Sequence, residues 1–189
     1  LKKEPAQTYK YDEDGNLTAI NQKGNAALNN VYASGTSNLI SESVGKQTYK
    51  YEYNKQNDVI STTNDTAKLN IDYDSYGNTT GTTLVTTDAN DSAYLKKLES
   101  KARYTSDGNY LVSQTDVNGI TTTYTVDEKT GLTTASTDSN RVTTQYLYDE
   151  YNDRQIGVKV EGVEDVSYTY AQGNLISLTK HGHLKDNSD

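Results

Sequence analysis

Carboxylates in short polar segments are the first side chains of this sequence whose spacing could support chemistry. The segment Asp12-Glu13-Asp14-Gly15-Asn16 superficially resembles a calcium loop. An EF-hand loop, however, needs three alternating oxygen ligands before its glycine and a bidentate Glu later. The pairs Asp12/Asp14 and Asp149/Asp153 have the residue types of a glycosidase pair. Acids are also expected in turns, and a turn that recurs along the chain cannot be a unique active site, so we predict turns here and no metal site.

Two histidines, His181 and His183, could serve as metal ligands or as general bases. They lie near the end of the sequence with no third ligand in pattern, and we expect them to be exposed to solvent. Serines and threonines are abundant, but neither a nucleophile elbow nor a histidine-paired serine motif is present. We therefore predict a protein that is not an enzyme, with no catalytic residues, no metal-binding or cofactor-binding residues, and no cofactor.

The tyrosines allow two interpretations. The chain has 17 Tyr and no Phe or Trp, and stripes of exposed tyrosine could stack on sugar rings. Alternatively, residues two apart in a strand share a face, and tyrosine pairs would then form cross-strand ladders that hold neighbouring hairpins in register. We favour ladders because the pattern recurs, and a carbohydrate-binding or cell-surface-binding module is the alternative. The pairs are Tyr9/Tyr11, Tyr51/Tyr53, Tyr146/Tyr148 and Tyr168/Tyr170.

The elements that must position these side chains repeat along the chain. Tyr9-Lys10-Tyr11-Asp12-Glu13-Asp14-Gly15-Asn16-Leu17-Thr18-Ala19-Ile20 reads as strand, tight turn and strand, and Tyr168 to Leu178 is the last copy. The last tyrosine before each turn is taken as the structural anchor of its repeat, with spacings of 21, 21, 20, 31, 20, 24 and 22 residues. A period of this size indicates a repeat architecture. The anchors are Tyr11, Tyr32, Tyr53, Tyr73, Tyr104, Tyr124, Tyr148 and Tyr170.

Glycine and asparagine mark the turn in most repeats. At Gly15 the pattern predicts a type I turn closed by a glycine bulge, because glycine takes positive φ without a Cβ clash. The third repeat has no glycine in Asn54-Lys55-Gln56-Asn57-Asp58, where asparagine can take the left-handed conformation instead. Asn118-Gly119 is a further hairpin signal. The predicted turn residues are Gly15, Asn16, Gly77, Asn78, Gly108, Asn109, Gly131, Gly173 and Asn174.

Composition agrees with a thin β-structure. Only 32% of the 189 residues are hydrophobic and the net charge is −8, values that would suggest disorder if strand-forming residues did not recur between turns. The absence of cysteine excludes a disulfide framework, and the acidic balance makes nucleic acid an improbable partner. No apolar run is long enough to span a membrane.

The fold class that follows is all-β: tandem β-hairpin repeats of ~21 residues in one long curved antiparallel sheet. We predict a single region over 1–189, with about eight repeats between 9 and 180, that is a fragment of a larger protein. About sixteen strands at roughly 4.8 Å each would be too wide for a flat sheet, hence the curvature. For 86–100 we expect an extended loop or a longer strand pair rather than a helix. The uncapped sheet edges predict edge-to-edge self-association.

The motif Tyr-x-Tyr-Asp-x-x-Gly-Asn-Leu, present as Tyr9 to Leu17, resembles the YD repeat of Rhs proteins, and the similarity extends over Tyr9 to Thr179. These repeats also occur in bacterial wall-associated proteins, insecticidal toxin complexes and animal teneurins. The resemblance implies a spiralling β-strip that, with many more repeats, forms a hollow shell around a C-terminal cargo, often a toxin. It also implies secretion or display at the cell surface or cell wall, with flanking YD repeats and the enclosed domain as partners. The core segment where such proteins cleave themselves is not visible in this sequence.

Overall fold

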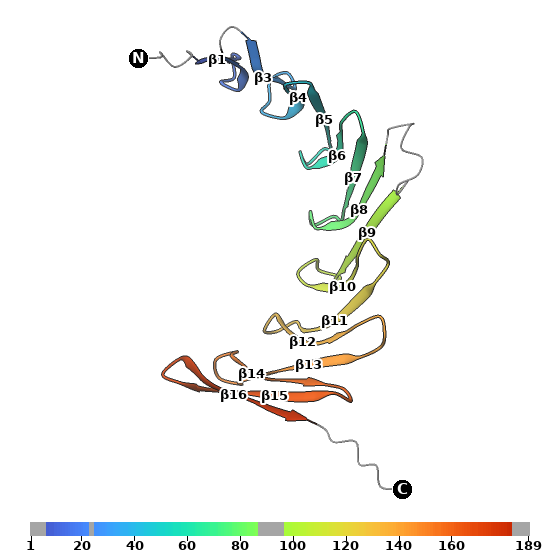
Figure 1. Cartoon of the computed structure of the whole chain (residues 1–189), viewed down its shortest axis with the longest axis vertical. Helices are drawn as coiled ribbons and strands as arrows, with labels where there is room; N and C mark the ends of the chain where they lie inside the picture. Colours follow the sequence, from blue (N-terminus) through green and yellow to red (C-terminus); the bar gives the residue numbers. More distant parts are fainter. Residues whose placement is uncertain (1–6, 23–24, 87–96, 183–189) are drawn as a thin grey trace. The chain divides into compact units, whose positions relative to one another are not determined.

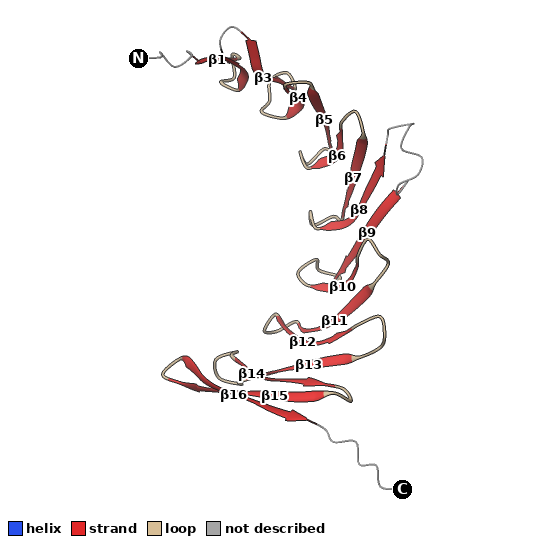
Figure 2. Cartoon of the chain, viewed as in Figure 1, coloured by secondary structure: helices blue, strands red, loops and turns tan. Residues whose placement is uncertain are grey.

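The computed structural model of the chain describes residues 7–22, 25–86 and 97–182. Those residues form sixteen β-strands and no helix (Figures 1 and 2). All the strands belong to one antiparallel sheet in which strand order equals sequence order. The prediction of an all-β fold built from tandem hairpins is therefore confirmed.

The chain divides between Glu99 and Ser100 into two compact units, and each is described by itself. The prediction of a single region over 1–189 stays a prediction. The first unit contains β1 (Gln7–Tyr11), β2 (Leu17–Gln22), β3 (Asn25–Tyr32), β4 (Leu39–Val44), β5 (Gln47–Tyr53), β6 (Val59–Thr63), β7 (Ala67–Tyr73) and β8 (Thr79–Thr86). The second contains β9 (Lys97–Tyr104), which begins just before the boundary, β10 (Leu111–Thr115), β11 (Thr121–Asp127), β12 (Leu132–Thr137), β13 (Thr143–Tyr148), β14 (Gln155–Val160), β15 (Glu164–Ala171) and β16 (Asn174–Gly182).

The segment 86–100 is only partly described. Thr86 ends β8 and Lys97 begins β9, and the prediction for residues 87–96 lies outside the described residues. Leu98 and Ala102, whose spacing is also compatible with a helix, lie in a strand.

Every hairpin of an odd strand with the next even strand contains a β-bulge at the same place. In the first hairpin, Tyr11 pairs with Leu17 and Lys10 with Ala19, which leaves Thr18 as the extra residue. A bulge bends the strand and increases its right-handed twist, so each unit is twisted rather than flat (Figure 1). The extra residue is β-branched in all eight hairpins, a type that favours extended backbone: Thr18, Ile40, Ile60, Thr80, Val112, Thr134, Ile156 and Ile176.

The residue after the bulge is always small. Gly157 shows why: a Cβ added there would lie 2.8 Å from the Val166 backbone oxygen on the next strand. The bulge thus brings neighbouring hairpins close at this point, and a larger side chain would hold them apart. The small residues are Ala19, Ser41, Ser61, Gly81, Ser113, Ala135, Gly157 and Ser177.

The described residues form almost no hydrophobic core. Ala19, 8% exposed, is the one buried apolar side chain among them, and no large side chain is fully buried. Among the described residues no helix is suited to crossing a membrane. Stability must come from contacts between successive hairpins, as in other repeat arrays.

Candidate functional site

Several turns share one hydrogen-bonded geometry. In the first, Asp12 Oδ1 accepts hydrogen bonds from the backbone N–H groups of Asp14 and Asn16, at 3.1 and 2.7 Å. The Gly15 N–H donates to the Asp12 carbonyl, and Gly15 is left-handed with φ of 83°. Because this capping needs an Asp or Asn followed three residues later by a left-handed residue, the motif is readable in sequence. The turn at Asn118-Gly119 has the same arrangement, with Asp116 as the acceptor.

The remaining predicted turn residues lie in turns or beside them. Gly77, Gly108, Gly131 and Gly173 are all left-handed. Asn109 donates its side-chain amide to Asp107 at 2.7 Å, and Asn174 is the first residue of β16. The glycine-free third turn places Asn57 at φ of 68°, as the sequence predicted.

An acid and an amide are paired across the turn, and their order can be exchanged. Asn78 Nδ2 donates to Asp74 Oδ2 at 3.1 Å, whereas in the third repeat Asn54 Nδ2 donates to Asp58 Oδ2 at 3.0 Å. One carboxylate and one amide form a bond in either order, whereas two carboxylates would repel each other.

These hydrogen bonds hold three turn carboxylates in their ionised form. The hydrogen bond from the Asn16 side chain lowers the pKa of Asp12 below 3.8. For Asp74, partial desolvation works in the opposite direction, but the hydrogen bonds from Asn78 and the turn backbone leave its pKa lowered. The Thr105 hydroxyl and the Asn109 N–H lower the pKa of Asp107. These carboxylate oxygens already accept hydrogen bonds from N–H and O–H groups of their own turn. Their role is therefore to cap the turn.

Successive hairpins are joined by a contact that we call the tyrosine clasp. In a clasp, the hydroxyl of an anchor tyrosine donates to a backbone carbonyl at the start of the even strand of the preceding hairpin. Tyr53 donates to Leu39 at 2.8 Å, and Tyr73 to Val59 at 3.0 Å. The other clasps are Tyr32 to Leu17 at 3.2 Å, Tyr148 to Thr133 at 2.9 Å and Tyr170 to Gln155 at 2.9 Å. The five clasps satisfy the hydroxyl and fix the distance between neighbouring hairpins.

The other three predicted anchors are placed differently. Tyr11, on the first described strand, is 62% exposed. Tyr104 is half-buried and pairs with Leu111, as an anchor does. In the sixth hairpin Val126 occupies the anchor position opposite Thr133, while Tyr124 lies two residues earlier, opposite Ser136.

The tyrosine two residues before an anchor makes different contacts. The Tyr146 hydroxyl lies 3.0 Å from Ser136 Oγ, and the Tyr51 hydroxyl donates to Glu42 Oε2 at 3.5 Å. Desolvation, followed by the charge of Glu42, raises the pKa of Tyr51, and desolvation raises that of Tyr148. These contacts fit the predicted role of tyrosine in holding hairpins together.

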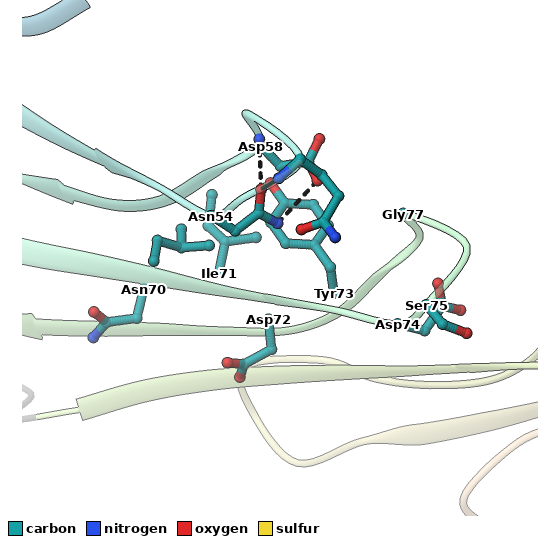
Figure 3. Close-up of a pocket in the computed structure, with 11 residues that line it drawn as sticks. Asn54, Asp58, Asn70, Ile71, Asp72, Tyr73, Asp74, Ser75 and Gly77 are labelled. Atoms are coloured by element: carbon teal, nitrogen blue, oxygen red, sulfur yellow. Dashed lines mark hydrogen bonds between the residues drawn. The ribbon is translucent and has the colours of Figure 1, made fainter. Parts of the chain in front are cut away.

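A shallow pocket of about 600 Å³ lies between the third and fourth turns and is lined by Asn54, Asp58, Asp72 and Tyr73 among others. Figure 3 shows Asn54 and Asp58 beside the ring of Tyr73, which comes from the next hairpin. A second pocket, of about 470 Å³, is lined by Asp127, Tyr148 and Asp149 at equivalent positions of a later hairpin pair. Because the same kind of pocket lies beside two clasps, Tyr73 and Tyr148, it is a product of the clasp geometry rather than a unique site.

Metal-binding groups do not converge in the part of the chain that the structure describes: no three His, Cys, Asp or Glu residues cluster there. His181 lies in β16 and is exposed, with Nε2 3.5 Å from Ser167 Oγ. His183 lies outside the described residues.

Comparison with known proteins places the fold. No protein-family model and no curated protein sequence matches the chain. The crystal structure of TcdB2-TccC3-TEV is similar with a TM-score of 0.51 and 14% identity, over 93% of this chain and 11% of that chain. TcdB2-TccC3-Cdc42 gives a TM-score of 0.48 and 12% identity, over 96% and 14% of the two chains. The Photorhabdus luminescens Tc holotoxin pore gives 0.46 and 13%, over 95% and 14%.

The first of these similarities shows that the chain has an Rhs-like β-sheet fold. At 14% identity this shared property is the fold, and the chain spans only about a tenth of the similar chain's length.

Proposed function

We propose that this chain is a non-enzymatic structural segment of a secreted or surface-exposed Rhs/YD-repeat protein. In this role it contributes to the wall of a β-shell that encloses or presents a C-terminal, toxin-type cargo. Its partners would be flanking YD repeats and the cargo domain of the same longer chain. The observation that carries the proposal is the tyrosine clasp, which recurs between hairpins with hydroxyl-to-carbonyl distances of 2.8 to 3.2 Å.

A contact that recurs along the chain favours a structural role in a shell wall over a catalytic or binding site. A catalytic or binding centre brings different side chains together at one place, whereas here the same tyrosine-to-carbonyl contact recurs at five positions along the chain. The bulges return in every hairpin, and the turn caps and the pockets each recur at more than one place along the chain. The Rhs-like fold of TcdB2-TccC3-TEV is compatible with this role.

The test is protease protection in a longer protein that contains this segment and its C-terminal region. We expect the C-terminal region to be digested much more slowly in the intact protein than when it is expressed alone. The double variant Tyr53→Phe/Tyr73→Phe, which removes two clasps, should increase its rate of digestion, while Tyr151→Phe, at a side chain 88% exposed, should not. Equal digestion of the free and the intact C-terminal region would refute enclosure. Recovery from the extracellular or cell-wall fraction tests the proposed location.

Carbohydrate binding is the second candidate, and the exposed rings of Tyr9, Tyr11 and Tyr151 favour it. A glycan array is the direct test. Glycan hits that disappear in Tyr151→Ala would support a binding module. The clasp tyrosines offer less for this role, because they are half-buried and their hydroxyls are already bonded to backbone carbonyls.

A further inference from the structure

Among the described residues of the second unit, one junction between hairpins lacks the clasp that the other two contain. The three junctions are β10–β11, β12–β13 and β14–β15. Tyr148 makes the clasp at the second of these junctions and Tyr170 makes it at the third. At the first junction the anchor position belongs to Val126, whose side chain has no hydroxyl group and therefore no hydrogen bond to donate. Other contacts must join β10 to β11.

The acceptor half of a clasp is nevertheless present at the β10–β11 junction. In the existing clasps the acceptor carbonyl belongs to the residue that pairs with the preceding anchor position, and Thr133, which pairs with Val126, accepts from Tyr148 in this way. Leu111, which pairs with Tyr104, is the equivalent residue of β10. Val126 follows Leu111 by 15 residues, the same interval as between Thr133 and Tyr148. The register therefore places position 126 where a donor would complete a clasp.

A different tyrosine covers the β10–β11 junction. Tyr110 lies at the end of the fifth turn, and a Cβ added to Gly131 of the sixth turn would lie 3.1 Å from Tyr110 Cε1 and 3.3 Å from its hydroxyl oxygen. The ring of Tyr110 therefore packs against the turn of the next hairpin. Thr115 Oγ1 and Thr121 Oγ1 lie 2.8 Å apart, which is the one side-chain hydrogen bond between β10 and β11 in the described part of the chain.

The β12–β13 junction contains an equivalent threonine pair and two further hydrogen bonds. The hydroxyl oxygens of Thr137 and Thr143 lie 3.1 Å apart. The bond between the Tyr146 hydroxyl and Ser136 Oγ and the clasp made by Tyr148 come in addition. Both ladders contain three register pairs, so the difference between the two junctions lies in their side chains.

We infer that the β10–β11 junction is a built-in seam, at which the second unit opens first and the β9–β10 hairpin separates from the hairpins that follow. Native proteins open locally where few contacts must break. In an array whose repeats contact only their neighbours, opening at one junction leaves the other junctions intact. The absence of one clasp hydrogen bond should favour the open state about fivefold. The inference does not depend on the proposed function.

Amide hydrogen exchange of the 189-residue chain, resolved by residue with NMR, tests the inference. After correction for intrinsic exchange rates, amides that bond across the β10–β11 ladder should be about fivefold less protected than amides that bond across the β12–β13 ladder. Equal protection of the two ladders, or lower protection across β12–β13, would overturn the inference.

Two substitutions at one position test the cause of the seam. Val126→Tyr supplies the donor that the Leu111 carbonyl lacks, and Val126→Phe, the matched control, adds the same ring without a hydroxyl. The β10–β11 amides should be about fivefold better protected in Val126→Tyr than in Val126→Phe. Because only the hydroxyl differs, any effect of fitting the larger ring is the same in both variants. Equal protection in the two variants would refute the missing clasp as the cause of the seam.

A third substitution tests the contact that replaces the clasp. Tyr110→Ala removes the ring that packs against Gly131. It should lower the protection of the β10–β11 amides further and leave that of the β12–β13 amides unchanged, because each junction opens separately. Unchanged protection across β10–β11 would refute the role of this ring, and an equal loss across both ladders would refute a seam confined to one junction.

Discussion

Removing one clasp hydroxyl should lower the free energy of unfolding by about the net value of one hydrogen bond. Tyr148 is suited to this test because its hydroxyl donates to the Thr133 carbonyl at 2.9 Å and its ring is half-buried. Tyr148→Phe keeps the ring and opens no cavity. The expected loss is therefore about 1 kcal/mol. A tyrosine hydroxyl is protonated at neutral pH and able to donate, and desolvation raises the pKa of Tyr148 further.

The assay is urea unfolding followed by far-UV circular dichroism, with Tyr151→Phe as the matched control. Tyr151 lies three residues further along the chain and is 88% exposed, so we expect almost no change there. Because repeat arrays can unfold in steps, hydrogen exchange at the amides of β12 and β13, which form the junction, should accompany the urea curves and show faster exchange in Tyr148→Phe. If the two variants agree to within about 0.3 kcal/mol, the clasp does not stabilise the junction and the reasoning fails.

Three further predictions concern single positions. Ser61→Ala should raise the free energy of unfolding by up to about 1 kcal/mol in thermal or urea unfolding, because Ser61 Oγ is buried with no hydrogen-bond partner; a lower stability would contradict this. Gly157→Ala should lower the free energy of unfolding by about 1–3 kcal/mol, because its Cβ would lie 2.8 Å from the Val166 oxygen. A melting curve identical to that of the wild type would show that the two strands move apart at little cost. The pKa of Asp74 is lowered, so its contribution to stability is present above its unfolded pKa and is lost as pH falls through the lower folded value. In an NMR titration Asn78→Ala should raise this pKa, and an unchanged value would exclude the cross-turn hydrogen bond as a cause.

The sequence was sufficient to predict the length of the repeat, the turns and the all-β fold class. Each of these depends on residues close together in the chain. An acceptor at Asp12 and a left-handed residue at Gly15 specify the first turn. The substitution of Asn57 for glycine was readable for the same reason, because asparagine is among the few residues that tolerate this backbone conformation.

The bulge in each even strand, which is distinct from the glycine bulge predicted at Gly15, and the small residue after it were missed because they depend on cross-strand register. Ile60 and Ser61 look like ordinary members of an alternating strand. Only the pairing of Glu52 with Ser61 and of Tyr53 with Val59 shows that Ile60 is extra. A signal was present in the sequence, since a β-branched residue followed by a small one recurs shortly after each of these turns.

Val126 was not predicted as an anchor because only tyrosines were considered for that position. It lies 22 residues after Tyr104 and 22 before Tyr148, whereas Tyr124 gives intervals of 20 and 24. An even interval would have pointed to the valine. The clasps themselves could not be predicted, because the distance from a hydroxyl to the preceding hairpin depends on how the bulge twists the strands.

The short reach of the clasp has a consequence for how such a chain can change in length. Each clasp joins residues only 14 or 15 positions apart, so no hairpin depends on a distant one for its hydrogen bonds. A whole hairpin can then be inserted or deleted as a cassette, with the flanking cassettes joining as the original ones did. A change of a few residues inside a cassette would instead shift the bulge and break two junctions. Proteins built in this way should vary in size by multiples of one cassette, with irregular additions confined to the turns between them.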